Sequence, residues 1–253
     1  MRLDKFLVAV EEPKRERKSE EKGIVVPMIF RDFIKYLIKV DGRYIHDLNI
    51  SISGSVLRAV YLSSDRVWMS VLEAEVKNCS NIDAKFRIFD CDLSTILKLT
   101  EVSRIIKMDV NHDVLTVNGK EFKVELDVDD FCLREPQISD EKFTEKIVLI
   151  DVDESSKLLR EIGKMTYTVM LTAKNGVLEV AWEEYDGQIC TTTLRSHVRE
   201  AKGVTVCFDP TRLSKILNNP FTNRILIEYG EDLPMKITFS RNVRCWIAPK
   251  SCE

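Results

Sequence analysis

The sequence predicts an α+β protein of two similar domains, each with antiparallel sheets packed on two helices. Short segments with alternating apolar and polar residues dominate the chain, as is typical of half-buried antiparallel strands. The sequence FDCDLSTIL at 89–97 resembles FDPTRLSKIL at 208–217. The two segments are about 120 residues apart, close to half the chain, which indicates an internal repeat. Chance similarity of two short amphipathic segments is the alternative, and the matching order of elements in the two halves argues against it.

The first half begins with a predicted strand at 23–28 and a helix at 30–39, where apolar residues recur at helical spacing. A second, shorter helix is predicted at 93–101. Alternating residues predict the remaining strands of this half at 48–53, 55–62, 67–76, 86–89, 105–110, 114–117 and 121–128.

The second half repeats this order, with a predicted strand at 146–150 and a helix at 153–164. A further helix at 211–218 ends before Pro220, because proline cannot continue a helix. The remaining strands are predicted at 166–173, 177–183, 188–195, 204–208, 224–229, 235–239 and 244–247.

Composition shifts set the predicted domain boundaries. Residues 1–22 form an N-terminal extension that is dense in charges of both signs, and the first domain covers 23–126. An acidic segment at 127–144, which contains Pro136 and little periodicity, connects it to the second domain at 145–253.

The overall composition excludes several classes of protein. No apolar run approaches the ~20 residues of a membrane helix, and the N-terminus lacks a signal-peptide pattern, so we expect a soluble, intracellular protein. With 38 basic and 41 acidic residues the chain has a net negative charge. A protein that coats nucleic acid is usually basic overall. The seven cysteines are scattered without a CxxC pair, which disfavours a metal site and makes free core thiols the preferred interpretation. Intracellular disulfides, as in some thermophiles, are the alternative.

The sequence offers no catalytic constellation. The three histidines are isolated, and neither a Gly-rich phosphate loop nor an HExxH or GxSxG motif occurs. Asp127, Asp129 and Asp130 lie close enough to suggest a cation, but no glycine or partnering glutamate completes a calcium loop, so a solvated acidic linker is the preferred interpretation. We therefore predict neither an enzyme nor a cofactor.

Basic residues gather on the outer faces of the predicted helices, opposite their apolar faces. One such face is usually only a solvated surface, but faces related by the repeat, in a net-acidic chain, predict a surface that meets a phosphate backbone. Aromatic residues are absent from these faces, so stacking on bases is not expected. Base readout, which would call for Asn, Gln or Arg aimed into a groove, is not suggested either. The candidate DNA-facing residues are Arg31, Lys35, Lys39, Lys98, Lys157, Arg160, Lys164, Arg212 and Lys215.

Four further segments, taken in order with the repeat, carry a family resemblance. They are LSSDRVWM at 62–69, ELDVDDFCL at 125–133, EDLPMKI at 231–237 and WIAPK at 246–250. Together they resemble the trimeric DNA sliding clamps of the proliferating-cell-nuclear-antigen family, and their wording is most like crenarchaeal, and hence archaeal, clamp subunits.

This resemblance implies a processivity factor for DNA replication and DNA repair. Three subunits would form a head-to-tail ring, as a homotrimer or as a heterotrimer with paralogues, around double-stranded DNA without sequence preference. DNA polymerase, ligase, nuclease and clamp loader would dock on it, in the cytoplasm on the nucleoid or in a eukaryotic nucleus. A specialised or checkpoint-type clamp subunit is the alternative, and a DNA-acting enzyme is disfavoured.

The resemblance also implies two protein-contact sites. An apolar pocket for a partner peptide would be lined by Leu62, Val67, Met69, Phe131, Leu133, Pro234, Trp246, Ala248 and Pro249. The subunit interface would pair an edge strand at 120–126 with one at 188–195, through Phe122, Val124, Ile189 and Thr191.

Overall fold

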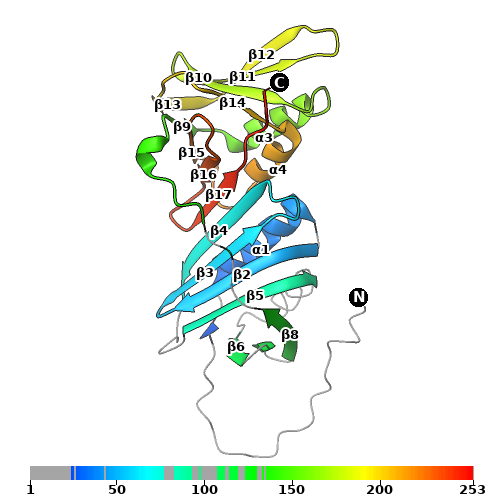
Figure 1. Cartoon of the computed structure of the whole chain (residues 1–253), viewed down its shortest axis with the longest axis vertical. Helices are drawn as coiled ribbons and strands as arrows, with labels where there is room; N and C mark the ends of the chain where they lie inside the picture. Colours follow the sequence, from blue (N-terminus) through cyan, green and yellow to red (C-terminus); the bar gives the residue numbers. More distant parts are fainter. Residues whose placement is uncertain are drawn as a thin grey trace, which may run out of the picture. The chain divides into compact units, whose positions relative to one another are not determined.

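The protein divides into two compact units in the computed structural model (Figure 1). The structure describes residues 24–25, 27–42, 44–76, 83–92, 97, 107–111, 114–118, 123–129, 133 and 135–252. Unit 1 comprises Met1–Ser64 and Leu72–Arg134, and unit 2 comprises Asp65–Val71 and Glu135–Glu253. The segment predicted to connect the domains, 127–144, contains the division between Arg134 and Glu135.

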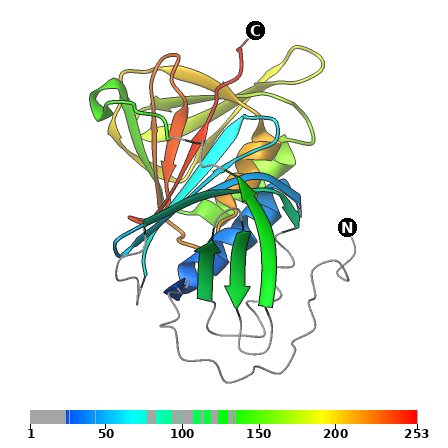
Figure 2. The ribbon, with the colours of Figure 1, turned by 60° about the horizontal axis from the view of Figure 1, so that its bottom comes forward.

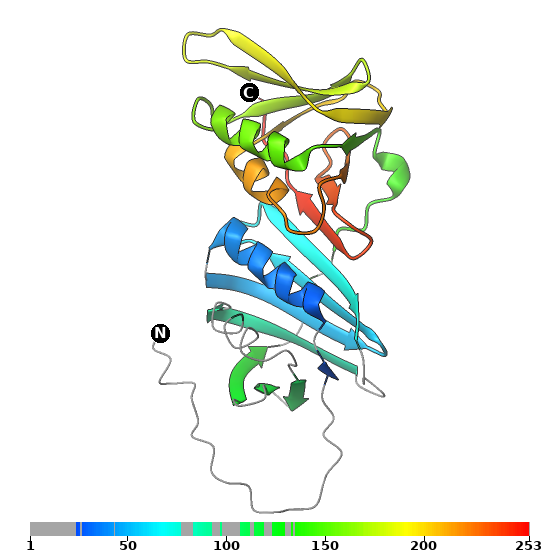
Figure 3. The same ribbon diagram turned by 180° about the vertical axis from the view of Figure 1, so that it is seen from behind.

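Unit 1 is built on an antiparallel sheet that is covered by one helix. Helix α1 (Met28–Asp41) lies across one face of β2 (Tyr44–Ser53) and β3 (Val56–Leu62), as Figure 3 shows. Phe33 and Leu37, one helical turn apart, are fully buried on this face. The strand order runs β1 (Ile24–Val25), β6 (Lys107–Asn111), β7 (Val114–Asn118), β8 (Lys123–Asp129), β5 (Asp83–Asp92), β2, β3 and β4 (Trp68–Glu75).

Strands β6, β7 and β8 lie side by side in an antiparallel meander (Figure 2). Strand β8 pairs with β7 along Lys123–Asp127 and with β5 only at Val128 and Asp129. The helix predicted at 93–101 falls outside the described residues except for Leu97, which is helical.

Unit 2 has two sheets and two helices. One sheet has the order β17 (Val243–Ile247), β16 (Met235–Thr238), β15 (Ile225–Tyr229), β9 (Glu145–Leu149) and β13 (Ser196–Glu200). The other has the order β12 (Ile189–Leu194), β11 (Val177–Glu183), β10 (Val169–Lys174) and β14 (Thr205–Phe208). The helices α3 (Val152–Ile162) and α4 (Pro210–Leu217) pack side by side, and a single 3-10 turn, η2 (Asp140–Lys142), lies in the connecting segment (Figures 1 and 3).

An aspartate caps the N-terminus of each helix of unit 2. Asp151 accepts a hydrogen bond from Glu154 N–H at 3.2 Å, and Asp209 accepts one from Arg212 N–H at 3.0 Å, which satisfies backbone donors that the first turn leaves open. Pro210 at the first position of α4 fits because it has no N–H to satisfy there. The sequence FDP thus fixes where the second repeat helix starts.

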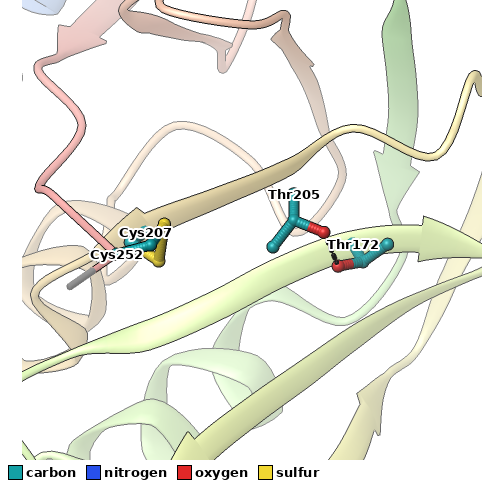
Figure 4. The surroundings of a disulfide bond; sticks show 4 residues. All are labelled: Thr172, Thr205, Cys207 and Cys252. Atoms are coloured by element: carbon teal, nitrogen blue, oxygen red, sulfur yellow. Dashed lines mark hydrogen bonds between the residues drawn. A yellow bond between two sulfur atoms is a disulfide. The ribbon is translucent and has the colours of Figure 1, made fainter.

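Most predicted elements are present in the described residues, but one strand was missed and one expectation about the cysteines was wrong. The strand β13 was not predicted, because SHVRE carries one apolar residue and no clear alternation; it pairs with β9 at the edge of its sheet. The prediction of free core thiols is wrong for Cys207 and Cys252, which form a disulfide (Figure 4). Cys190 and Cys245 are not in a disulfide.

Candidate functional sites

The exposed side of α3 and α4 is basic. Lys157 and Arg160 on α3 and Lys215 on α4 are exposed, while Leu159 and Ile216 on the opposite faces are fully buried. In the described part of the chain, these three cations make no ion pair. They are therefore open to an external anion.

Close packing brings the two helices into one layer. Ser156 Oγ donates to Ser214 O at 2.8 Å, and Ser214 Oγ donates to Ser156 O at 2.7 Å. Gly163 lies so close to α4 that a Cβ there would meet Thr211 Oγ1 at 2.4 Å. Small residues at the crossing thus hold the basic side chains of α3 and α4 on the same surface.

Two other predicted DNA-facing residues of unit 2 have carboxylate partners. Lys164 Nζ lies 2.8 Å from Glu161 Oε1, in an exposed pair that is worth little because solvent screens it. Arg212 Nη1 lies 3.3 Å from Asp65 Oδ1, and its Nη2 also bonds this carboxylate. Asp65 belongs to the loop before β4, so Arg212 fastens that loop to α4.

In unit 1, Lys35 and Lys39 are exposed on α1 and Arg31 is half-buried, on the side away from Phe33 and Leu37. Lys98 lies outside the described residues.

Part of the predicted partner pocket assembles around the end of β17. Ala248 N–H donates to Val67 O at 2.8 Å, which joins the segment after β17 to the loop before β4. Arg66 in that loop has a φ of 58°, in the left-handed region, and Asp65 Oδ1 accepts Val67 N–H at 3.1 Å to hold the turn. Val67, Met69, Pro234 and Pro249 are half-buried, and Ala248 is exposed.

Trp246, another predicted pocket residue, is held against the connecting segment. It is 5% exposed, and its Nε1 donates to Glu135 Oε1 at 3.0 Å. The same carboxylate accepts hydrogen bonds from Arg244 Nη2 at 2.7 Å and from Arg244 Nε. Glu135 therefore anchors the connecting segment to β17, a role that the sequence analysis did not assign to it.

A groove of about 590 Å³ follows this anchor. Its walls are the connecting segment at 135–139 and the outward side chains of β16 and β17. Lys236 lies within it, 3.3 Å from Asp140 Oδ1 and 3.2 Å from Glu228 Oε2. Among the predicted pocket residues that are described, Trp246 alone lines this groove.

The remaining pocket residues belong to unit 1. Leu62 ends β3 and is half-buried, and Leu133 N–H donates to Oδ1 of the buried Asn49 at 3.3 Å. Phe131 lies outside the described residues.

Strand β12 is an open sheet edge. It pairs with β11 alone among the described strands, and Ile189 is 64% exposed. Glu184 N–H donates to Gln188 O at 2.9 Å at the hairpin end, and hydrogen-bonded pairs alternate along antiparallel strands. Cys190 and Thr192 therefore direct their N–H groups to β11, and Thr191 directs its own N–H outward.

The partner strand predicted for this edge is β8, whose Val124 pairs with Val117 of β7. Its second neighbour, β5, pairs only at residues 128–129, so among the described residues the remainder of β8 has one paired side. Phe122 lies outside the described residues.

Two absences concern the described residues only. No group of three or more His, Cys, Asp or Glu side chains is placed to hold a metal ion there. None of the helices described is both long and apolar enough to cross a membrane.

Known structures share this fold. The proliferating cellular nuclear antigen of Entamoeba histolytica is similar at 16% sequence identity with a TM-score of 0.66, over 88% of this chain and 95% of that one. A β sliding clamp of C. crescentus is similar at 12% identity with a TM-score of 0.73, over 95% of this chain and 69% of that one. No family model matches the chain, and no curated protein matches it by sequence. The fold is therefore that of a DNA clamp.

Proposed function

We propose that this protein is a sliding-clamp subunit that encircles duplex DNA and tethers replication and repair enzymes to it. The observation that carries this proposal is the layer of α3 and α4, which presents Lys157, Arg160 and Lys215 as open cations on a clamp fold. Such cations contact phosphates loosely and release counterions, which gives attraction without sequence readout.

In this proposal the protein acts by topology and not by tight binding. A closed ring leaves the duplex only by opening or at a DNA end, so weak phosphate contacts suffice. A polymerase docked on the ring remains near the primer end, and its high effective concentration there makes synthesis processive. No chemical step is required of the clamp itself.

Ring closure would use the open edges of β12 and β8. Among the described residues each edge has one unpaired side, and pairing these sides head to tail between subunits would satisfy both. The sequences of the C-terminal segments are most like those of crenarchaeal clamp subunits. The ring would be either a homotrimer or a heterotrimer with paralogues.

The partner peptide would dock where the connecting segment meets the end of β17. Val67, Met69, Pro234, Ala248 and Pro249 supply partly exposed apolar groups. Apolar anchors from a short helical turn in the peptide would dominate the affinity, as in other small pockets.

Light scattering after size exclusion tests the assembly. A single chain has a mass of 29.2 kDa, so a ring gives about three times this mass, either alone or with paralogues from the same organism. A chain that remains monomeric with every paralogue contradicts the proposal.

A further inference from the structure

The segment that follows β17 is fastened to unit 2 at both of its ends. At its start, Ala248 N–H donates to Val67 O at 2.8 Å. At its far end, Lys250 N–H donates to Cys207 O at 2.7 Å, and Cys252 is bonded to Cys207 through the disulfide (Figure 4). Residues 248–252 therefore lie along β14 as a short strap, which we call the C-terminal strap.

The two sulfurs differ in their environment. Cys207 lies in β14 and is 1% exposed, whereas Cys252 is exposed. A reductant can therefore reach the disulfide from the Cys252 side. Lys250 also holds this end, through its N–H and through Nζ, which donates to Tyr167 O at 2.9 Å.

We propose that the Cys207–Cys252 disulfide is a redox latch on the C-terminal strap. A thiolate of a cellular dithiol attacks the sulfur of the exposed Cys252, and Cys207 leaves as a thiolate that takes up a proton. The second thiol of the reductant then displaces Cys252 as a thiol and closes its own disulfide. Two electrons pass from the dithiol to the cysteine pair, and the strap is released.

Release matters because the strap contains Ala248 and Pro249. This consequence rests on the proposed function, in which both residues belong to the partner pocket. With the latch closed, their backbone is fixed before a partner arrives. With the latch open, part of the strap has to be ordered on binding, and that entropy cost lowers the affinity. Oxidation thus sets how strongly the clamp binds its partners.

The test compares the oxidised full-length protein, the same protein reduced by dithiothreitol, and Cys252→Ser. Cys190→Ser is the matched control, because Cys190 is a free, half-buried thiol outside the latch. Hydrogen exchange is followed by mass spectrometry in the strap and in β9. Calorimetry measures binding of a synthetic clamp-binding peptide with aliphatic and aromatic anchors on one helical turn.

We expect exchange in the strap to rise at least tenfold after reduction and in Cys252→Ser, with β9 unchanged and Cys190→Ser equal to wild type. Peptide affinity should fall several-fold in the same two samples. If hydrogen exchange in the C-terminal strap does not change on reduction, the proposed latch is wrong. Faster exchange with unchanged affinity overturns its control of docking. If the oxidised protein binds no peptide while strap exchange responds, the failure belongs to the proposed pocket and the latch stands.

Discussion

The carboxylate of Glu135 accepts hydrogen bonds from Arg244 and from the indole N–H of Trp246, so one side chain fastens the connecting segment to the last strand. Arg244 and Glu135 are 20% and 9% exposed, which makes the pair largely shielded from water. A shielded pair is costly to break on one side only, because the remaining charge then has no partner.

Replacing this carboxylate should therefore destabilise unit 2. Glu135→Gln keeps the shape and removes the charge, and we expect a loss of about 2 kcal/mol in the free energy of unfolding, since Arg244 retains some access to water. Denaturant titration measures it. Glu141→Gln, an exposed change in the same segment, is the control and should leave stability unaltered; equal stabilities of both variants would show that Glu135 is not an anchor.

The open edge of β12 gives a test that separates assembly from folding. Thr191→Pro removes an N–H that points away from β11, so the isolated chain should unfold at the same denaturant concentration as wild type while the ring is lost. Thr192→Pro removes an N–H directed to β11 and should destabilise the chain itself. Thr191→Ser retains the N–H and should assemble normally. An intact ring formed by Thr191→Pro would rule out this edge as the interface.

Most strands and helices were predictable because their residues alternate or recur at helical spacing within a few positions. The basic face of α3 follows from the same periodicity: Leu159 and Ile162 are buried, so Lys157 and Arg160 face outward. Such local patterns require no knowledge of distant contacts.

Contacts between distant residues were not predictable in this way. The Arg244–Glu135 pair spans 109 residues and the Cys207–Cys252 disulfide spans 45, and neither spacing carries a local signature. The hydrogen bond from Trp246 to Glu135 spans 111 residues and likewise has no local signature in the sequence. Contacts between segments that are far apart in the sequence depend on three-dimensional packing.

The basic layer should determine the salt dependence of DNA binding. Replacing Lys157 and Lys215 by Gln should reduce the slope of log affinity against log salt by roughly 0.9 for each phosphate contact that is lost. The matched control replaces Lys174 and Lys202, which are exposed but lie off α3 and α4. Filter binding at several salt concentrations measures both slopes. Identical slopes in the two double variants would contradict a phosphate-facing role for the helices.

Partner docking should respond to changes at two distant positions in the sequence. Leu133→Ala and Pro249→Ala should each weaken a clamp-binding peptide, by about 2 kcal/mol where the side chain is an anchor, with ring formation unaffected. Calorimetric titration compares them with Ile138→Ala, a half-buried change in the wall of the adjacent groove. Wild-type affinity in both variants would mean that the pocket has been placed wrongly.

Retention on circular DNA shows whether the protein encircles the duplex. The assembled protein, with any paralogues and the clamp loader from its own source, is loaded on a nicked circular duplex, separated from free protein, and divided into two portions. One portion is cut once with a restriction enzyme. A sliding clamp remains on the circle at high salt and runs off the linear DNA, so we expect loss after the single cut. Equal retention on circular and linear DNA, or equal loss from both, would contradict it.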